Sequence, residues 1–162
     1  GLAGDASALD VGLTQTEGGV GWFGIRSDNG TTFYNAGTAT SKHAGWEAGD
    51  IMGLVFDSDN KKLTFSKNGG WWDATDSWTG SSPDYTTHYI DCSGGSYDEF
   101  FVYTAISAGN SQTATWAANF GNGSFDGTAI SSAGTNVSGQ VGLFEYSMPS
   151  SSKVLSTKGL NS

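Results

Sequence analysis

Residues 49–69, which read GDIMGLVFDSDNKKLTFSKNG, restrict the fold of this chain more than any other stretch. Apolar residues recur at every second position along two short runs, and this period of two predicts two strands with one face in a core. The positions predicted to face the core are Ile51, Gly53, Val55, Leu63 and Phe65. Residues 57–62 between the runs are rich in Asp and Asn, whose side chains bond nearby backbone N–H groups, so the chain reverses there. Asn68-Gly69 favours a second tight turn, and the stretch therefore predicts a β-hairpin with a tight turn after it.

Three other segments accompany the hairpin in order along the chain. They are Val20-Gly21-Trp22-Phe23-Gly24-Ile25, Ala118-Asn119-Phe120-Gly121 with Phe125 after it, and residues 152–160 (SKVLSTKGL). Together with the Gly-Asp, Leu-Thr-Phe and Lys-Asn-Gly elements of the hairpin, they resemble the SPRY (B30.2-like) domain. Residues 152–160 are similar to a tail segment found after SPRY domains in bacteriophage and phage-like proteins. The sequence departs from the family in residues 1–19, which lack its first strand, and in residues 70–98, which are longer than its usual connection.

Short strand patterns account for most of the chain, and no helical period persists. Beyond the hairpin, strands are expected at residues 20–26, 31–35, 86–90, 99–107, 113–120 and 141–146. At 162 residues with 13% aromatic side chains, the chain is expected to form one all-β domain, an antiparallel two-sheet β-sandwich. The pattern alone leaves a jelly roll as an alternative. The resemblance implies a SPRY/concanavalin-like sandwich.

The expected organisation has three parts. Residues 1–19 form either an edge segment, with residues 10–13 as a short edge strand, or an N-terminal arm that orders only on a neighbouring subunit. Residues 20–149 form the sandwich, which carries an insert at about residues 70–98, and residues 150–162 form a polar C-terminal tail. The main connectors within the sandwich are residues 36–48 and 121–139.

The charge balance excludes several classes of partner. A net charge of −9 with only seven scattered basic residues argues against sequence-independent binding to nucleic acid or to an anionic membrane, both of which need clustered Lys and Arg. No apolar run approaches the ~20 residues of a membrane span, and residues 1–19 lack the pattern of a signal peptide. Charged residues make up 14% of the chain against a usual ~25%, so Ser, Thr, Asn and Gly must supply the polar surface. Such surfaces are common on extracellular and virion proteins.

The carboxylates do not form the pairs that glycoside hydrolysis needs. That reaction requires two carboxyl groups ~5 to 9.5 Å apart, whereas the glutamates, at positions 17, 47, 99 and 145, are isolated from one another. Asp98 and Glu99 are adjacent, so on a strand they point to opposite faces. His43 and His88 are expected at the surface, since no Gly-x-Ser-x-Gly elbow accompanies them. We therefore expect no enzymatic activity and no catalytic residue.

The acidic residues of the insert are the one possible metal site in the sequence. Asp73, Asp76 and Asp84 are the candidate ligands for a structural calcium ion, because acidic loops supply the oxygen atoms that calcium takes. Solvated loop carboxylates are the default interpretation, and no other cofactor is expected. With two histidines and one cysteine, Cys92, a zinc site is improbable. Cys92 is expected to be a buried apolar side chain.

Aromatic residues gather in the insert and beside it, and they are the candidate binding residues. Large aromatic faces with a polar edge can stack on sugar rings or anchor a protein partner. The candidates are Trp71, Trp72, Trp78, Tyr85, Tyr89 and Trp46. Trp46 is also expected to cover one open end of the core, and Trp22 and Trp116 are expected in or beside the core.

The resemblance implies a non-enzymatic virion structural or surface-binding module, such as a capsid decoration protein or a domain of a head or tail fibre. Its expected partners are other virion subunits, further copies of the chain in an oligomer such as a trimer, or a host surface glycan. Its expected location is the virion surface. Two alternatives stay open: a carbohydrate-binding or carbohydrate-active domain of a secreted, extracellular bacterial protein, and a SPRY adaptor that binds a peptide.

Overall fold

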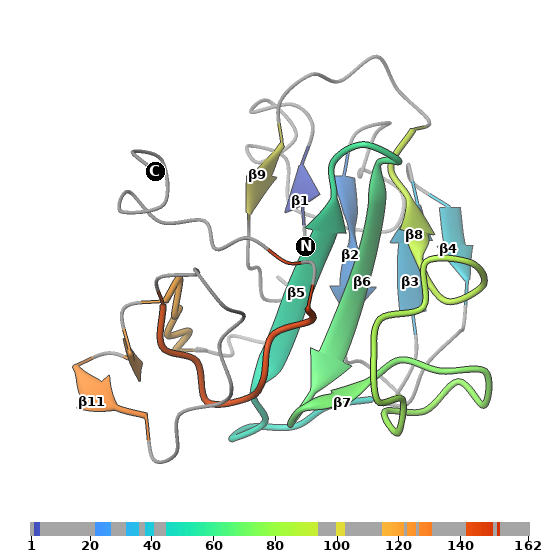
Figure 1. Ribbon diagram of the computed structural model, residues 1–162. Helices are drawn as coiled ribbons and strands as arrows, with labels where there is room; N and C mark the ends of the chain where they lie inside the picture. Colours follow the sequence, from blue (N-terminus) through green and yellow to red (C-terminus); the bar gives the residue numbers. More distant parts are fainter. Residues whose placement is uncertain are drawn as a thin grey trace. The chain divides into compact units, whose positions relative to one another are not determined.

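The protein is known from a computed structural model in which every described element is a β-strand (Figure 1). The chain divides into two compact units, residues 1–114 and residues 115–162, where the sequence predicts a single domain. The structure describes residues 2–3, 22–26, 32–35, 38–40, 45–93, 100–102, 115–121, 123–125, 127–130, 142–150 and 152. The all-β prediction is confirmed for these residues, and every strand pairing among them is antiparallel.

The first sheet of unit 1 has five strands in the order β4-β3-β2-β1-β9. They are β1 (Leu2–Ala3), β2 (Trp22–Arg26), β3 (Thr32–Asn35), β4 (Thr38–Thr40) and β9 (Phe101–Val102). The predicted strands at residues 20–26 and 31–35 are confirmed by β2 and β3, which pair as a hairpin. Two expectations are corrected. Residues 38–40 belong to a strand rather than to a connector, and β1 pairs with both β2 and β9, so its two residues form neither a free arm nor an edge.

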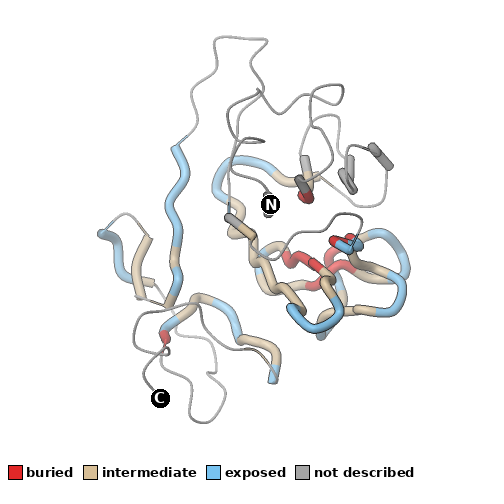
Figure 2. Tube along the Cα trace, turned by 90° about the horizontal axis from the view of Figure 1, so that it is seen from above, coloured by how far each residue is buried: buried red, intermediate tan, exposed pale blue. Residues whose placement is uncertain are grey.

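The second sheet of unit 1 is built around β6. Its strands are β5 (Met52–Asp57), β6 (Lys62–Lys67), β7 (Gly70–Trp71) and β8 (Ile90–Asp91). All six residues of β5 pair with β6, which confirms the predicted hairpin. The other edge of β6 is shared, because β8 pairs with its first two residues and β7 with its last two. The four middle residues of β6 are all buried, so both faces of the strand are covered; Figure 2 colours the chain by burial, with buried residues in red.

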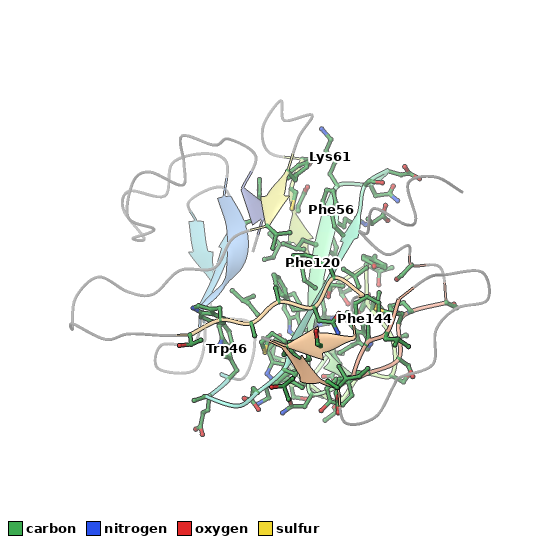
Figure 3. The ribbon with its side chains drawn as sticks, turned by 90° about the vertical axis from the view of Figure 1, so that its left-hand side faces the viewer. Trp46, Phe56, Lys61, Phe120 and Phe144 are labelled. Atoms are coloured by element: carbon green, nitrogen blue, oxygen red, sulfur yellow. The ribbon has the colours of Figure 1, made fainter. Side chains whose placement is uncertain are left out.

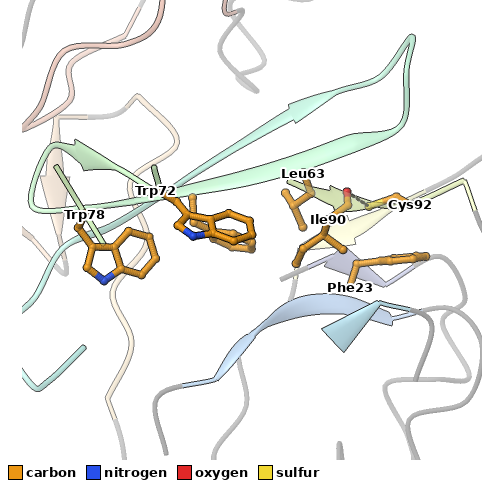
Figure 4. Close-up of a cluster of buried hydrophobic side chains, with 7 residues drawn as sticks. Phe23, Leu63, Trp72, Trp78, Ile90 and Cys92 are labelled. Carbon is orange, nitrogen blue, oxygen red and sulfur yellow. Dashed lines mark hydrogen bonds between the residues drawn. The ribbon is translucent and has the colours of Figure 1, made fainter. Parts of the chain in front are cut away.

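Side chains from both sheets meet in one buried cluster (Figure 4). Its members are Phe23, Leu63, Phe65, Trp72, Trp78, Ile90 and Cys92. The ring of Phe100 joins the sheets at their margin, since its centroid lies 4.8 Å from that of Phe56 and 6.2 Å from that of Phe23. This cluster is the core of unit 1.

The predicted core face of β5 is wrong. Leu54 lies opposite Phe65 and Phe56 lies opposite Leu63, and residues that face each other across an antiparallel pair share one side of the sheet. The side chains that pack against the core are therefore those of Met52, Leu54 and Phe56 rather than those of Ile51, Gly53 and Val55. A shift of one position moves every side chain of a strand to the other face. The larger Met, Leu and Phe side chains bury more apolar area on the side that faces the first sheet.

Several other strands are absent from the described residues where the sequence predicts them. Residues 115–120 and 142–146 form no strand beyond a single bridging residue, and of residues 86–90 only Ile90 belongs to one. Unit 2 instead contains a short hairpin of β10 (Ser124–Phe125) and β11 (Thr128–Ala129), inside the predicted connector. Residues 4–21 and 103–114 lie outside the described part, so the predictions there are not tested.

Candidate functional site

At the open end of the central hairpin, the residues of the Gly-Asp and Lys-Asn-Gly elements are hydrogen-bonded to one another. The Asn68 side chain donates from Nδ2 to Asp50 Oδ1 at 2.6 Å and accepts the Ile51 N–H at Oδ1 at 2.8 Å. Asp50 also accepts the Glu47 N–H at 2.8 Å, and Lys67 Nζ lies 3.7 Å from it. The Glu47 N–H, then the Asn68 amide and the charge of Lys67, hold the pKa of Asp50 below its usual range. The Gly-Asp and Lys-Asn-Gly elements therefore close this end of the hairpin.

The three tryptophans of the insert are buried, which corrects their assignment to an exposed binding surface. Trp71, Trp72 and Trp78 are 6%, 2% and 9% exposed. Trp71 exchanges two backbone hydrogen bonds of 2.8 Å with Gly80, which folds the start of the insert back on itself beside β6. A Cβ atom on Gly70 would lie 1.8 Å from the Trp78 carbonyl oxygen, so this turn needs glycine. The indoles of Trp72 and Trp78 belong to the core because the insert returns to the sheet instead of projecting from it (Figure 4).

Asp73 organises the first half of the insert. Its carboxylate accepts hydrogen bonds from the backbone N–H and the hydroxyl of Thr75 at 2.9 and 2.7 Å, and from the N–H of Thr79 at 3.1 Å. The hydroxyls of Ser77 and Thr79 also donate to it. These donors, the Thr75 and Thr79 hydroxyls first, hold the pKa of Asp73 well below its usual range. Because donors of the same loop already occupy the carboxylate, the role of Asp73 is structural.

Asp84 has the same role in the second half of the insert. It lies 2.9 Å from His88 Nδ1 and accepts from both the N–H and the hydroxyl of Thr86 and of Thr87. His88 and the two threonines hold the pKa of Asp84 far below its usual range. The Thr87 hydroxyl lies 2.7 Å from His88 Nδ1, the same nitrogen that Asp84 contacts. A catalytic triad needs its hydroxyl and its carboxylate on different ring nitrogens, so this arrangement is not a triad.

The loop of residues 84–88 is attached to the core. The backbone oxygen of His88 accepts a 3.1 Å hydrogen bond from the hydroxyl of Thr64, a fully buried residue of β6. The His88 ring meets Trp72 edge-on, with centroids 5.1 Å apart and planes at 87°. Across the described residues, no three His, Cys, Asp or Glu side chains lie close enough to hold a metal ion. The calcium candidates Asp73, Asp76 and Asp84 are therefore not brought together there.

Tyr85, Tyr89 and Trp46 are the predicted binding residues that stay partly exposed. Lys62 Nζ donates to the Tyr85 carbonyl oxygen at 2.6 Å and lies 4.3 Å from the centroid of the Tyr89 ring, a cation–π contact that fixes the loop to β6. Burial, with the charge of Asp57 adding to it, raises the pKa of Tyr85 to about 12. Trp46 lies before β5, away from both tyrosines in the sequence, and is half-buried (Figure 3).

Among the described residues, four of the five large apolar side chains that are exposed belong to unit 2, and the fifth is Val102 of unit 1. We define the apolar surface of unit 2 as Trp116, Phe120, Leu143 and Tyr146, which are 50%, 47%, 49% and 38% exposed. Phe120 is labelled in Figure 3. The exposure of Trp116 corrects its predicted place in or beside the core. Sequence reasoning missed this surface because apolar residues at positions 113–120 suggested a buried central strand.

Hydrogen bonds join the two segments that carry this surface. Asn119 Nδ2 donates to the Leu143 carbonyl oxygen at 2.9 Å, and the Leu143 N–H donates to the Gly121 carbonyl oxygen at 3.1 Å. Asn119 Oδ1 also accepts the Gly121 N–H at 2.7 Å. The Asn-Phe-Gly element thus fixes the two segments to each other. Along the sequence, Asp126 and Glu145 are the only charged residues in positions 115–150.

Comparisons with protein-family models, with curated proteins and with solved structures find no match. The SPRY resemblance therefore stays a prediction that rests on the quoted motifs. Within the part of the chain that the structure describes, no helix has the length and apolar character to cross a membrane.

Proposed function

We propose that this chain is a non-enzymatic surface-binding module of a virion, folded as a SPRY-type two-sheet sandwich, that contacts other virion subunits or a host glycan. The observation that carries the proposal is the apolar surface of unit 2. Large aromatic side chains left half in solvent are characteristic of contact surfaces, because each offers a wide apolar face and little conformational entropy to lose. The segment that carries them, positions 115–150, contains only two charged residues, which suits a neutral partner.

The state of the carboxylates supports a non-enzymatic role. A general acid needs a carboxyl group whose pKa is raised toward the working pH. The pKa of each perturbed aspartate in the described part is instead lowered, because loop hydrogen bonds stabilise the charged form. These residues are Asp50, Asp57, Asp73, Asp84 and Asp91. Each of these five carboxylates accepts hydrogen bonds within its own turn or loop and stays charged, so none of them holds a proton that it could donate.

The size of the surface limits its partners. An aromatic side chain presents ~150 to 250 Å², so the three aromatic rings of this surface offer roughly 300 Å², to which Leu143 adds a little. A standard protein interface takes about 800 Å² from each partner. The surface would therefore form the centre of a contact between subunits, or the whole of a contact with a few sugar rings.

The test compares Phe120→Ser with Val102→Ser. Phe120 and Val102 are 47% and 45% exposed, so both changes remove an exposed apolar side chain, but only the first lies in unit 2. We expect the native chain to form an oligomer by light scattering or to retain a sugar on a glycan array. Phe120→Ser should weaken that binding by about tenfold or more, whereas Val102→Ser should leave it unchanged. A native chain that is monomeric and binds no glycan, or two variants with equal effects, would contradict the proposal.

A further inference from the structure

Asn68-Gly69 combines a reactive dipeptide with an unusual degree of restraint. When glycine follows asparagine, no side chain shields the glycine nitrogen, and this nitrogen can attack the asparagine Cγ. A bond forms from the Gly69 nitrogen to Cγ, the bond from Cγ to Nδ2 breaks, and ammonia leaves. Water then opens the resulting succinimide ring to aspartate or isoaspartate. No oxidant, metal or second protein is required.

The folded chain holds both polar atoms of the Asn68 side-chain amide and the Asn68 backbone N–H. Nδ2, the leaving group, donates to Asp50 at 2.6 Å, and Oδ1 accepts from Ile51 at 2.8 Å. The Asn68 N–H donates to the Ile51 carbonyl oxygen at 2.8 Å, so the backbone is fixed as well. Asn68 and Gly69 have φ angles of 50° and 85°, the paired left-handed conformation of a tight hairpin turn. Asn68 is exposed, so access of water is not what restricts the reaction.

We propose that Asn68 is a spontaneous deamidation site that its hydrogen bonds to Asp50 and Ile51 keep unreactive until this end of the hairpin opens. Conversion replaces the Nδ2 donor with an oxygen that cannot donate, directly against the Asp50 carboxylate. Two like charges then meet where a 2.6 Å hydrogen bond stood, and Lys67 Nζ, 3.7 Å from Asp50, offsets them only in part. This end of the hairpin therefore cannot form the same hydrogen bonds again, and a deamidated residue 68 identifies a chain in which it has opened.

The test follows deamidation of Asn68 in the full chain by peptide mapping and mass spectrometry during warm, mildly alkaline incubation. Folded native chain should react at least about tenfold more slowly than the same chain in urea, because reaction waits for local opening. Asp50→Ala, which removes the acceptor of Nδ2, should bring the folded rate close to the rate in urea. Asp57→Ala is the matched control, since it removes the carboxylate that orders the turn at the other end of the hairpin.

The outcomes separate protection by these contacts from general stability. A faster reaction in Asp50→Ala but not in Asp57→Ala supports the proposal. Equal rates in folded and urea-treated native chain would overturn it, as would equal acceleration by the two variants while both remain folded by circular dichroism. If Asp50→Ala does not fold, Asp50→Asn takes its place. It keeps an oxygen acceptor for Nδ2, so protection should persist, and loss of protection in that folded variant would also overturn the proposal.

Discussion

The solvent exposures of Trp72 and Trp116 are the reverse of those that the sequence predicts, and this reversal gives a quantitative prediction. Trp72 belongs to the insert predicted to be exposed, yet it is 2% exposed in the core of unit 1. Trp116 belongs to a predicted buried strand, yet it is 50% exposed. Replacing each with alanine should therefore affect stability in the opposite order from that expected on sequence alone.

The expected magnitudes follow from burial. Trp72→Ala removes a fully buried indole and leaves a cavity, and such a change lowers the free energy of unfolding by about 3 to 5 kcal/mol. Trp116→Ala gives up roughly 100 Å² of buried area, which at ~25 cal/mol per Å² is at most about 2.5 kcal/mol, and it leaves no enclosed cavity. With a urea dependence of about 2 kcal/mol per M, the first change should lower the unfolding midpoint by about 2 M and the second by about 1 M or less.

The assay is urea unfolding followed by far-ultraviolet circular dichroism, because removing a tryptophan alters the fluorescence signal itself. Trp72→Phe, which keeps an apolar ring, provides a milder variant if Trp72→Ala does not fold, and its midpoint should lie between those of the native chain and of the fully truncated variant. A midpoint shift for Trp72→Ala no larger than that for Trp116→Ala would refute the burial argument and would return the insert to the surface.

Three further predictions concern unit 1. The pKa values of Asp73 and Asp84 are lowered in the folded state, so their contribution to stability is complete above the unfolded value of 3.8 and is lost as the pH falls below it. The urea midpoint of the native chain should therefore drop from about pH 4 downward. The midpoint of Asp84→Asn should drop less steeply over the same range. Cys92 is fully buried, and burial with the nearby Asp91 charge raises its pKa to about 12, so a thiol reagent should label it only in the unfolded chain, and rapid labelling of folded protein would disprove this. Gly70→Ala should lower the thermal midpoint by about 5 °C or more, as its Cβ atom would lie 1.8 Å from the Trp78 carbonyl oxygen, and an unchanged midpoint would contradict the tight packing of the insert.

The sequence predicts best those features that depend on neighbours along the chain. The two strands of the central hairpin, the reversal between them and the left-handed turn at Asn68-Gly69 all follow from local alternation and turn chemistry. The hairpin of β2 and β3 is confirmed for the same reason. Each of these signals is complete within a few residues, so no distant contact is needed to interpret it.

The features that the sequence does not predict depend on distant packing. Both sides of β5 carry apolar residues, so alternation identifies a strand without identifying its buried face. The insert resembles an exposed loop because it is rich in Gly, Ser and Asp. Its aspartates, however, accept hydrogen bonds from N–H and hydroxyl groups of the same loop. The backbone can therefore fold tightly enough to bring Trp72 and Trp78 back into the core. For the candidate site, only the partly exposed Tyr85, Tyr89 and Trp46 remain from the predicted set.

The most direct test of the proposed function is hydroxyl-radical footprinting of the chain, alone and with the partner or glycan that it retains, measured residue by residue by mass spectrometry. In the free chain, Trp116 and Phe120 should be oxidised strongly and the three insert tryptophans weakly, in keeping with their exposure. On binding, oxidation of Trp116 and Phe120 should fall while that of Val102 stays constant. Protection of the insert with no change at Trp116 and Phe120 would contradict the account, because the contact surface would then lie in unit 1.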